Sequence, residues 1–260
     1  MQVEILKKVV DEVGKGKKAC LVFITEVKGS VPGANDSMMA VFEDGQTFGT
    51  IGGGPMEYEV TKKAIEAIKN EKDDSFDLRL NKSSDLNMIC GGENKGYIKV
   101  FMPQPQLIIY GAGHVGQKLA RVAVRTGFDV TVVDPREEFK DKEDFIGIKK
   151  FLAMDSKEAN AYIDFSSSNT YLVICTTNSD KEVLTNVLGK DYKYIGMIGS
   201  RHKIKLVFDD LKERGIDQKY LDQIYTPIGF DIDNGKVEEI AISIISQILA
   251  VKNNKYKEFI

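Results

Sequence analysis

The hydrophobic positions of the first hundred residues alternate between helical and strand periods. Val3, Leu6, Val10 and Val13 recur at helical spacing, which predicts a helix near the start of the chain. Farther along, β-branched runs predict strands, and an apolar face that includes Val60 and Ala64 predicts a second helix. In chain order we expect a helix ending near Gly14 or Gly16, a buried strand at 19–27, a hairpin of strands at 38–42 and 46–51, a helix at 56–71, and paired strands at 76–80 and 96–101.

The pattern changes after residues 102–106, where two prolines favour a stiff, extended connection. Beyond this segment, compact apolar strands alternate with helical segments, which is typical of βαβ units and a parallel sheet. The strands are expected at 107–110, 130–134, 171–177 and 194–199, and the last helix at 237–252. We therefore expect an α/β protein with a small N-terminal α/β domain at 1–103 and a Rossmann-like domain at 104–260.

Composition narrows the class of protein. Hydrophobic residues make up 42% of the 260 residues and charged residues 29%, as in ordinary globular proteins, and the net charge is -3. No long basic run is present, so nucleic acid is not an expected partner. We expect no membrane span, because no stretch approaches roughly 18 apolar residues, and no signal peptide, so the expected location is cytoplasmic. Three widely spaced cysteines argue against a disulfide framework or a structural zinc site.

A glycine-rich turn follows the first strand of the expected Rossmann-like domain. Gly111 permits a tight turn, Gly113 lets a diphosphate approach the backbone, and Gly116 allows close packing of the next helix. The helix N-terminus suits an anion because its N–H groups have no partner within the helix. Asp134, which closes the next strand, can accept hydrogen bonds from a ribose hydroxyl.

Two nearby residues modify this interpretation. Arg136 follows Asp134 closely and could pair with a phosphate instead of leaving the aspartate to a ribose. His114 occupies a variable position of the turn, beside Val115, and faces the expected ligand; the alternative is an ordinary surface histidine.

A second anion site is expected where the strand at 194–199 meets the next helix. Ser200 is a plausible N-cap, and Arg201 and Lys203 add positive charge at the carboxyl end of a strand. The alternative is an ordinary capped helix.

Two segments of the N-terminal half carry candidate chemistry. The glycines Gly52, Gly53 and Gly54 can expose bare N–H groups before a helix, or form only a tight structural turn. Cys90 precedes two glycines, where a thiol can be accessible and reactive, although a small loop residue has the same sequence context. Cys20 and Cys175 lie in apolar runs and are expected to be inert core thiols.

Taken together, these motifs resemble the xanthine dehydrogenase accessory proteins of the XdhC and CoxI family, over nearly the whole chain. The order and spacing of the motifs carry the resemblance, because each alone is a weak signal. The motifs are GSVP at 29–32, GTIGGGPME at 49–57, CGG at 90–92, GAGHVG at 111–116, VTVVDPREEF at 130–139, YIGMIGSRHK at 194–203, TPIGFDI at 226–232 and EEIAISIISQI at 238–248.

The resemblance implies an accessory protein rather than an enzyme. Members bind the molybdenum cofactor, a molybdopterin in its mono- or dinucleotide form. They support its sulfuration and deliver it to a molybdenum hydroxylase such as xanthine dehydrogenase. The implied partners are that apoenzyme, a cysteine desulfurase and a second copy of the chain in a homodimer. The candidate cofactor contacts on these motifs are Ser30, Gly52, Gly53, Gly54, Glu57, Cys90, Gly111, Gly113, His114, Val115, Gly116, Asp134, Arg136, Ser200, Arg201 and Lys203. The thiol of Cys90 suits a soft, sulfur-ligated metal.

Two positions depart from the family pattern. Asp36 stands where the family usually has a glycine, and Thr177 stands where it usually has a histidine. If that histidine helps to hold the cofactor in relatives, this chain holds its ligand differently or binds another one.

The motifs are also compatible with two other functions. The glycine turn with Asp134 is also compatible with an NAD(P)-dependent oxidoreductase, and with a regulatory domain that senses nucleotides. A dehydrogenase needs a proton donor in addition. His114 and His202, the two histidines of the chain, both lie in anion-binding contexts.

Overall fold

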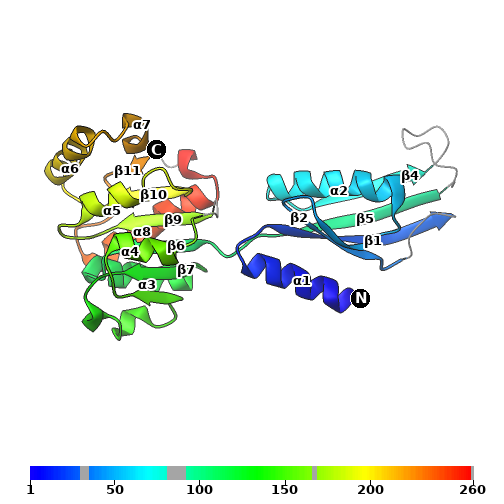
Figure 1. The fold of residues 1–260 in the computed structure, drawn as a ribbon, viewed down its shortest axis with the longest axis horizontal. Helices are drawn as coiled ribbons and strands as arrows, with labels where there is room; N and C mark the ends of the chain where they lie inside the picture. Colours follow the sequence, from blue (N-terminus) through cyan, green and yellow to red (C-terminus); the bar gives the residue numbers. More distant parts are fainter. Residues whose placement is uncertain (30–34, 81–91, 166–168, 259–260) are drawn as a thin grey trace. The chain divides into compact units, whose positions relative to one another are not determined.

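The computed structural model describes residues 1–29, 35–80, 92–165 and 169–258. The chain divides into two compact units, Met1–Pro103 and Gln104–Ile260 (Figure 1). The candidate contacts Ser30 and Cys90 lie outside the described residues.

The first unit is built on one antiparallel sheet. Its strand order is β3-β2-β1-β5-β4. The central strand pairs on both sides, with Val22 opposite Met39 on one neighbour and Ile98 on the other. The strands are β1 (Ala19–Gly29), β2 (Met38–Phe42), β3 (Thr47–Thr50), β4 (Asp74–Leu80) and β5 (Gly92–Phe101).

Two helices, α1 (Gln2–Gly14) and α2 (Gly54–Lys69), cover opposite faces of this sheet (Figure 1). The predicted apolar face of α2 is buried against the sheet, since Met56, Val60 and Ala64 are at most 1% exposed. On α1 the packed residues are Ile5 and Val9.

Of the four residues whose spacing predicted α1, Val13 packs against the sheet and the other three do not. Val3, Leu6 and Val10 are 62%, 44% and 69% exposed. The helix carries two apolar stripes, and periodicity alone does not select between them because both have helical spacing.

The second unit contains a six-stranded parallel sheet in the order β11-β10-β9-β6-β7-β8. Numbered along this unit, the order is the 3-2-1-4-5-6 arrangement of a Rossmann fold. The predicted fold class, a small α/β region followed by a Rossmann-like parallel sheet, is therefore confirmed. The strands are β6 (Gln106–Tyr110), β7 (Asp129–Val133), β8 (Lys150–Leu152), β9 (Thr170–Ile174), β10 (Tyr194–Met197) and β11 (Ile224–Tyr225).

Helices bury both faces of the parallel sheet. One core joins α3 (His114–Arg125) and α8 (Val237–Lys252) to the sheet. The opposite core joins α4 (Ser156–Ala159), α5 (Asp180–Val187), α6 (Arg201–Glu213) and α7 (Gln218–Leu221). Short 3₁₀ turns lie at Glu137–Phe139, Glu143–Phe145, Asn160–Tyr162 and Tyr256–Glu258. In the described part of the chain, no helix is long and apolar enough to cross a membrane.

Candidate functional site

The glycine turn joins β6 to α3, and its three glycines have different surroundings. Gly111 has φ +112, and a Cβ there would lie 2.7 Å from the carbonyl oxygen of Cys175. A Cβ on Gly116 would lie 2.0 Å from the carbonyl oxygen of Gly111. A Cβ on Gly113 would meet nothing within 4 Å. Gly111 and Gly116 are therefore required by packing, whereas Gly113 borders open space.

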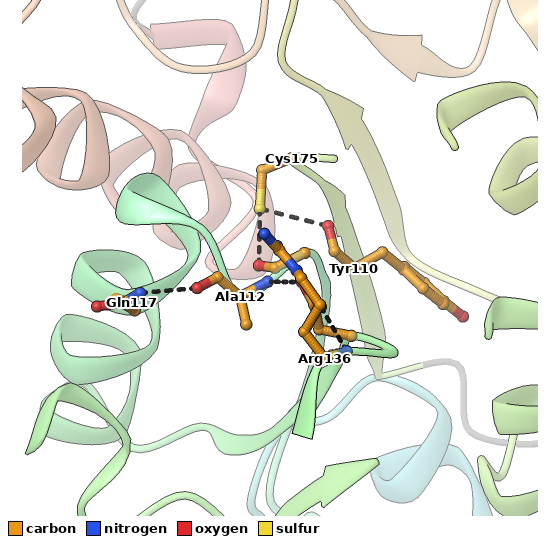
Figure 2. A network of polar contacts seen from close by, with 7 residues as sticks. Tyr110, Ala112, Gln117, Arg136 and Cys175 are labelled. Atoms are coloured by element: carbon orange, nitrogen blue, oxygen red, sulfur yellow. Dashed lines mark hydrogen bonds and ion pairs between the residues drawn. The ribbon is translucent and has the colours of Figure 1, made fainter. Parts of the chain in front are cut away.

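Some backbone amides of this turn already donate hydrogen bonds within the protein, and others do not. The Ala112 N–H donates to Asp134 Oδ2 at 2.7 Å, and the Gln117 side chain donates to the Ala112 carbonyl at 2.8 Å (Figure 2). Within the described ranges, the N–H groups of Gly113, His114 and Val115 have no hydrogen-bond acceptor. These are the amides that a helix leaves unpaired at its start, so they remain available to an anion.

A cavity of about 450 Å³ lies beside this turn at the carboxyl ends of the strands. Open α/β sheets commonly bind ligands at this edge. The turn, the end of β7 and the segments after β8 and β9 form its wall. Its polar and charged lining includes Asp134, Arg136, Asp155, Ser156, Thr176, Thr177, Asn178, Ser179 and Glu182.

Asp134 and Arg136 form an ion pair on the wall of the cavity. The Arg136 side chain donates through Nε to Asp134 Oδ1 and through Nη2 to Asp134 Oδ2, each at 2.8 Å. Burial alone would raise the pKa of Asp134, but the hydrogen bonds from Arg136 and from the Ala112 amide outweigh it and lower the pKa. Asp134 therefore stays ionised and is already bound by the protein itself.

At the predicted second anion site, Ser200 and Lys203 bind groups of the protein itself. Ser200 caps α6 by accepting the Lys203 N–H at 3.2 Å. The Lys203 ammonium lies 2.7 Å from Asp180 Oδ2 and 3.0 Å from the Thr176 carbonyl, while Asp180 is 2% exposed. Lys203 therefore neutralises a buried carboxylate and fixes the segment after β9 that lines the cavity. Arg201 is exposed at the start of the same helix.

In the first unit, the glycine loop before α2 binds a carboxylate of its own chain. Glu57 Oε2 accepts the N–H groups of Ile51 at 3.0 Å and Gly53 at 3.1 Å, and the Thr50 hydroxyl at 2.5 Å. Gly52 donates to the Thr50 hydroxyl oxygen at 3.1 Å. The amides of Ile51 and Gly53 are therefore occupied by a carboxylate of their own chain in this structure.

Neither of the two described thiols is activated. Burial raises the pKa of Cys20 and of Cys175 to about 12. Cys175 was expected inside a strand, but it lies just past β9, lines the cavity, and donates to the Tyr110 and Gly111 carbonyls at 3.3 Å (Figure 2). Sequence reasoning missed this position because the strand ends one residue earlier than its apolar run.

The structure shows the surroundings of Asp36 and Thr177, the two positions that differ from the family pattern. Asp36 has φ 70, in the left-handed region that glycine adopts without strain. Thr177 lines the cavity, so the usual histidine position does belong to this wall. His114, by contrast, is exposed at the first position of α3. The sequence did not single out Asp155, Glu182 or Asp180, because isolated acidic residues give no signal of their own.

Comparison with known proteins identifies the family of the chain. Residues 107–248 match the XdhC Rossmann domain, and residues 13–77 match the XdhC and CoxI family. YqeB of Escherichia coli K12 is 32% identical over 233 residues, which cover 89% of this chain and 43% of YqeB. A protein of Bacillus subtilis 168, named as a probable subunit of xanthine dehydrogenase, is 25% identical over 60% of this chain and 46% of that protein. The chain thus spans less than half the length of these two relatives.

Two further proteins are similar over most of the chain. The molybdenum cofactor insertion chaperone PaoD of Escherichia coli K12 is 21% identical over 95% of this chain and 88% of PaoD. A crystal structure from Bacillus halodurans, described as a xanthine dehydrogenase, superimposes with a TM-score of 0.52 and 21% identity over 97% of this chain and 96% of that one. At that identity the structural likeness supports the fold alone. Because the Rossmann domain match covers more than half of the chain, the protein belongs to the XdhC and CoxI family.

Proposed function

We propose that this protein is a maturation factor that binds the molybdenum cofactor and delivers it to a molybdenum hydroxylase of the xanthine dehydrogenase type. The proposal rests on the cavity beside Gly113. There the unpaired amides at the start of α3 border space that a ligand can enter. The cofactor carries a phosphate, and this corner has the donors and the access that a phosphate requires. The names of PaoD and of the Bacillus subtilis relative support the choice of cofactor and target.

The residues of the described chain fit the phosphate end of the cofactor. Gly113, His114 and Val115 would donate their amides, and Arg136 would supply charge from the end of β7 beside them. When bound, the cofactor supplies oxygen-atom and electron transfer to its target enzyme; this chain contributes binding and orientation.

The metal end of the cofactor is expected to face a different group. Neither Cys20 nor Cys175 is suited as a thiolate ligand, because burial raises the pKa of each thiol to about 12. In the described ranges, no cluster of three His, Cys, Asp or Glu side chains could hold a metal ion. Cys90 remains our proposed contact to the molybdenum. Sulfuration by a cysteine desulfurase, and action as a homodimer, are also part of the proposal.

The second candidate function is an NAD(P)-dependent oxidoreductase or a nucleotide sensor. The Rossmann strand order and the position of Asp134 after β7 favour it. The commitment of that carboxylate to Arg136 disfavours NAD, which would need it for ribose.

Anaerobic purification with the molybdenum cofactor separates the two candidates. We expect molybdenum and pterin to co-elute with the protein and NAD and NADP to bind weakly. Tight NAD binding without retained molybdenum or pterin would favour the oxidoreductase.

Replacing Cys90 tests the proposed metal contact. Cys90→Ala should retain less molybdenum than the unmodified protein, because a thiolate is a preferred ligand of a soft metal. Cys20→Ala removes a thiol from the core of the first unit and serves as the matched control, with retention unchanged. Equal retention in all three proteins would show that Cys90 is not a contact.

A further inference from the structure

The carboxylate of Asp134 has no acceptor capacity left for a ligand. A carboxylate offers about four lone-pair sites. Oδ1 accepts the backbone N–H of Arg136 at 3.0 Å and its Nε at 2.8 Å. Oδ2 accepts the Ala112 N–H at 2.7 Å and Arg136 Nη2 at 2.8 Å. The residue is also only 3% exposed. A ribose diol placed at the end of β7 would therefore find no open acceptor on Asp134.

The guanidinium of Arg136, in contrast, keeps N–H donors that have no acceptor among the described residues. Arginine has five N–H donors, and two of them are directed at Asp134. The side chain is 51% exposed and lines the cavity. The Phe139 ring, whose centroid lies 4.4 Å from Arg136 Cζ, stacks on the guanidinium and helps to hold its plane. The group is thus both fixed in place and available.

Other charges limit where an anion can lie in the cavity. Asp155 and Glu182 also line it, from the segment after β8 and from α5. The Asp155 carboxylate already accepts the Glu158 N–H at 2.9 Å, as the cap of α4. These carboxylates disfavour negative groups on their side of the cavity. The favourable place for an anion is therefore the corner formed by Arg136 and the start of α3.

We propose that Arg136, and not Asp134, meets the ligand at the end of β7, so that the cavity selects a ligand with a phosphate monoester there and rejects one that presents a ribose diol. The inference rests on the proposed function only in taking this cavity as the place where a phosphate-bearing ligand binds. For the molybdenum cofactor, it favours the form that ends in a phosphate over a dinucleotide form whose ribose lies at this corner.

A pair of probes that differ by one phosphate tests the proposal. ADP-ribose presents a diol on its adenosine ribose, and 2′-phospho-ADP-ribose presents a phosphate at the same place. Calorimetric titration of the full chain should give binding of the phosphorylated probe at least tenfold tighter, which corresponds to about 1.4 kcal/mol. Equal affinities, a preference for ADP-ribose, or no binding of either probe would overturn the proposal.

Substitution of the arginine should remove the preference. Arg136→Met takes away the charge and also two donors to Asp134, which then regains acceptors for a diol; the preference should vanish or invert. Because this variant leaves a buried carboxylate with fewer partners, Arg136→Gln is the second variant. Its amide can still donate to Asp134, but it carries no charge for a phosphate. Retained preference in a folded Arg136 variant contradicts the proposal.

Arg121→Met is the matched control. Arg121 is also a half-exposed arginine of this unit with an aspartate partner, Asp144, but it does not line the cavity. The tenfold preference should persist in this variant, and its loss there would overturn the assignment to Arg136. The unmodified protein could prefer 2′-phospho-ADP-ribose and yet retain no pterin after anaerobic purification. That result would contradict the proposed function but would still support the role of Arg136 in selecting a phosphate.

Discussion

Two glycines of the β6–α3 turn, three positions apart, should respond in opposite ways to the same substitution. In Gly116→Ala the new Cβ would lie 2.0 Å from the Gly111 carbonyl oxygen and 3.3 Å from Cys175 Sγ. The first obstacle is backbone of the turn itself, so no side-chain rotation relieves it. In Gly113→Ala the new Cβ meets nothing within 4 Å, and the backbone has φ -68, which alanine adopts freely.

The expected magnitudes follow from these contacts. Overpacking costs about 1–3 kcal/mol, and a backbone clash at this distance belongs at the upper end. Alanine recovers about 1 kcal/mol of helix propensity relative to glycine. The net loss for Gly116→Ala is therefore about 2 kcal/mol, or about 4–8 °C in the Tm of a unit of this size. For Gly113→Ala, the loss of a favourable N-cap glycine and the lower conformational entropy of the unfolded chain nearly cancel, within about 0.5 kcal/mol.

The two described cysteines report on the two units separately. Cys20 lies in the core of the first unit and Cys175 lies in the second, and both thiols have a pKa raised to about 12 by burial. Alkylation requires the thiolate, so the raised pKa slows the reaction of each thiol in the folded unit, and the rate should rise when that unit unfolds. Brief exposure to iodoacetamide along a temperature ramp, followed by mass spectrometry of the two peptides, gives one midpoint for each unit.

Gly116→Ala should lower the Cys175 midpoint and leave the Cys20 midpoint unchanged. Gly113→Ala should leave both unchanged but weaken binding of 2′-phospho-ADP-ribose about tenfold or more, because its methyl group occupies the approach to the amides. An unchanged Cys175 midpoint in Gly116→Ala, or an equal drop in both variants, would refute the reasoning from these contacts.

Three further predictions concern charged side chains that pair with other groups of the protein. Lys203→Met leaves the buried Asp180 without its cation and should destabilise the second unit by about 3 kcal/mol in the alkylation assay, whereas Lys205→Met on the same helix should not. Glu57→Ala removes the acceptor of the Ile51 and Gly53 amides, so hydrogen exchange measured by mass spectrometry should be faster at these amides. The free energy of unfolding should fall by about 1 kcal/mol. Unchanged exchange would contradict the role of Glu57 as the anion bound by this loop. Hydrogen bonds from three lysines lower the pKa of Glu12 from 4.5 to about 2. The ionised Glu12 therefore stabilises the fold fully above about pH 5, and this stabilisation is lost as the pH falls toward 2. In Glu12→Gln, the melting temperature measured by circular dichroism should depend less on pH in this range.

Local spacing in the sequence was sufficient for the backbone of the site. The strand before Gly111, the helix after it and the following strand that ends at Asp134 predicted a Rossmann turn, because this order of elements around spaced glycines is local in the sequence. Hydrophobic period likewise predicted the alternation of strands and helices in the second unit. The short elements β8, α4 and β11 were not predicted, since segments of two to four residues carry too little period to detect.

The sequence alone thus determined the family, the fold class and the place where an anion can approach the backbone. Only the tertiary structure decided which charged side chains remain free there. Asp134 is committed to Arg136, Lys203 to Asp180, and Glu57 to its own glycine loop. The physical reason is that backbone conformation depends on neighbours along the chain. The pairing of long side chains depends also on rotamer, distance and burial, which packing fixes even for partners that are close in sequence. Asp134 is buried against the Ala112 amide at the end of another strand, and Lys203 meets Asp180 from a different helix.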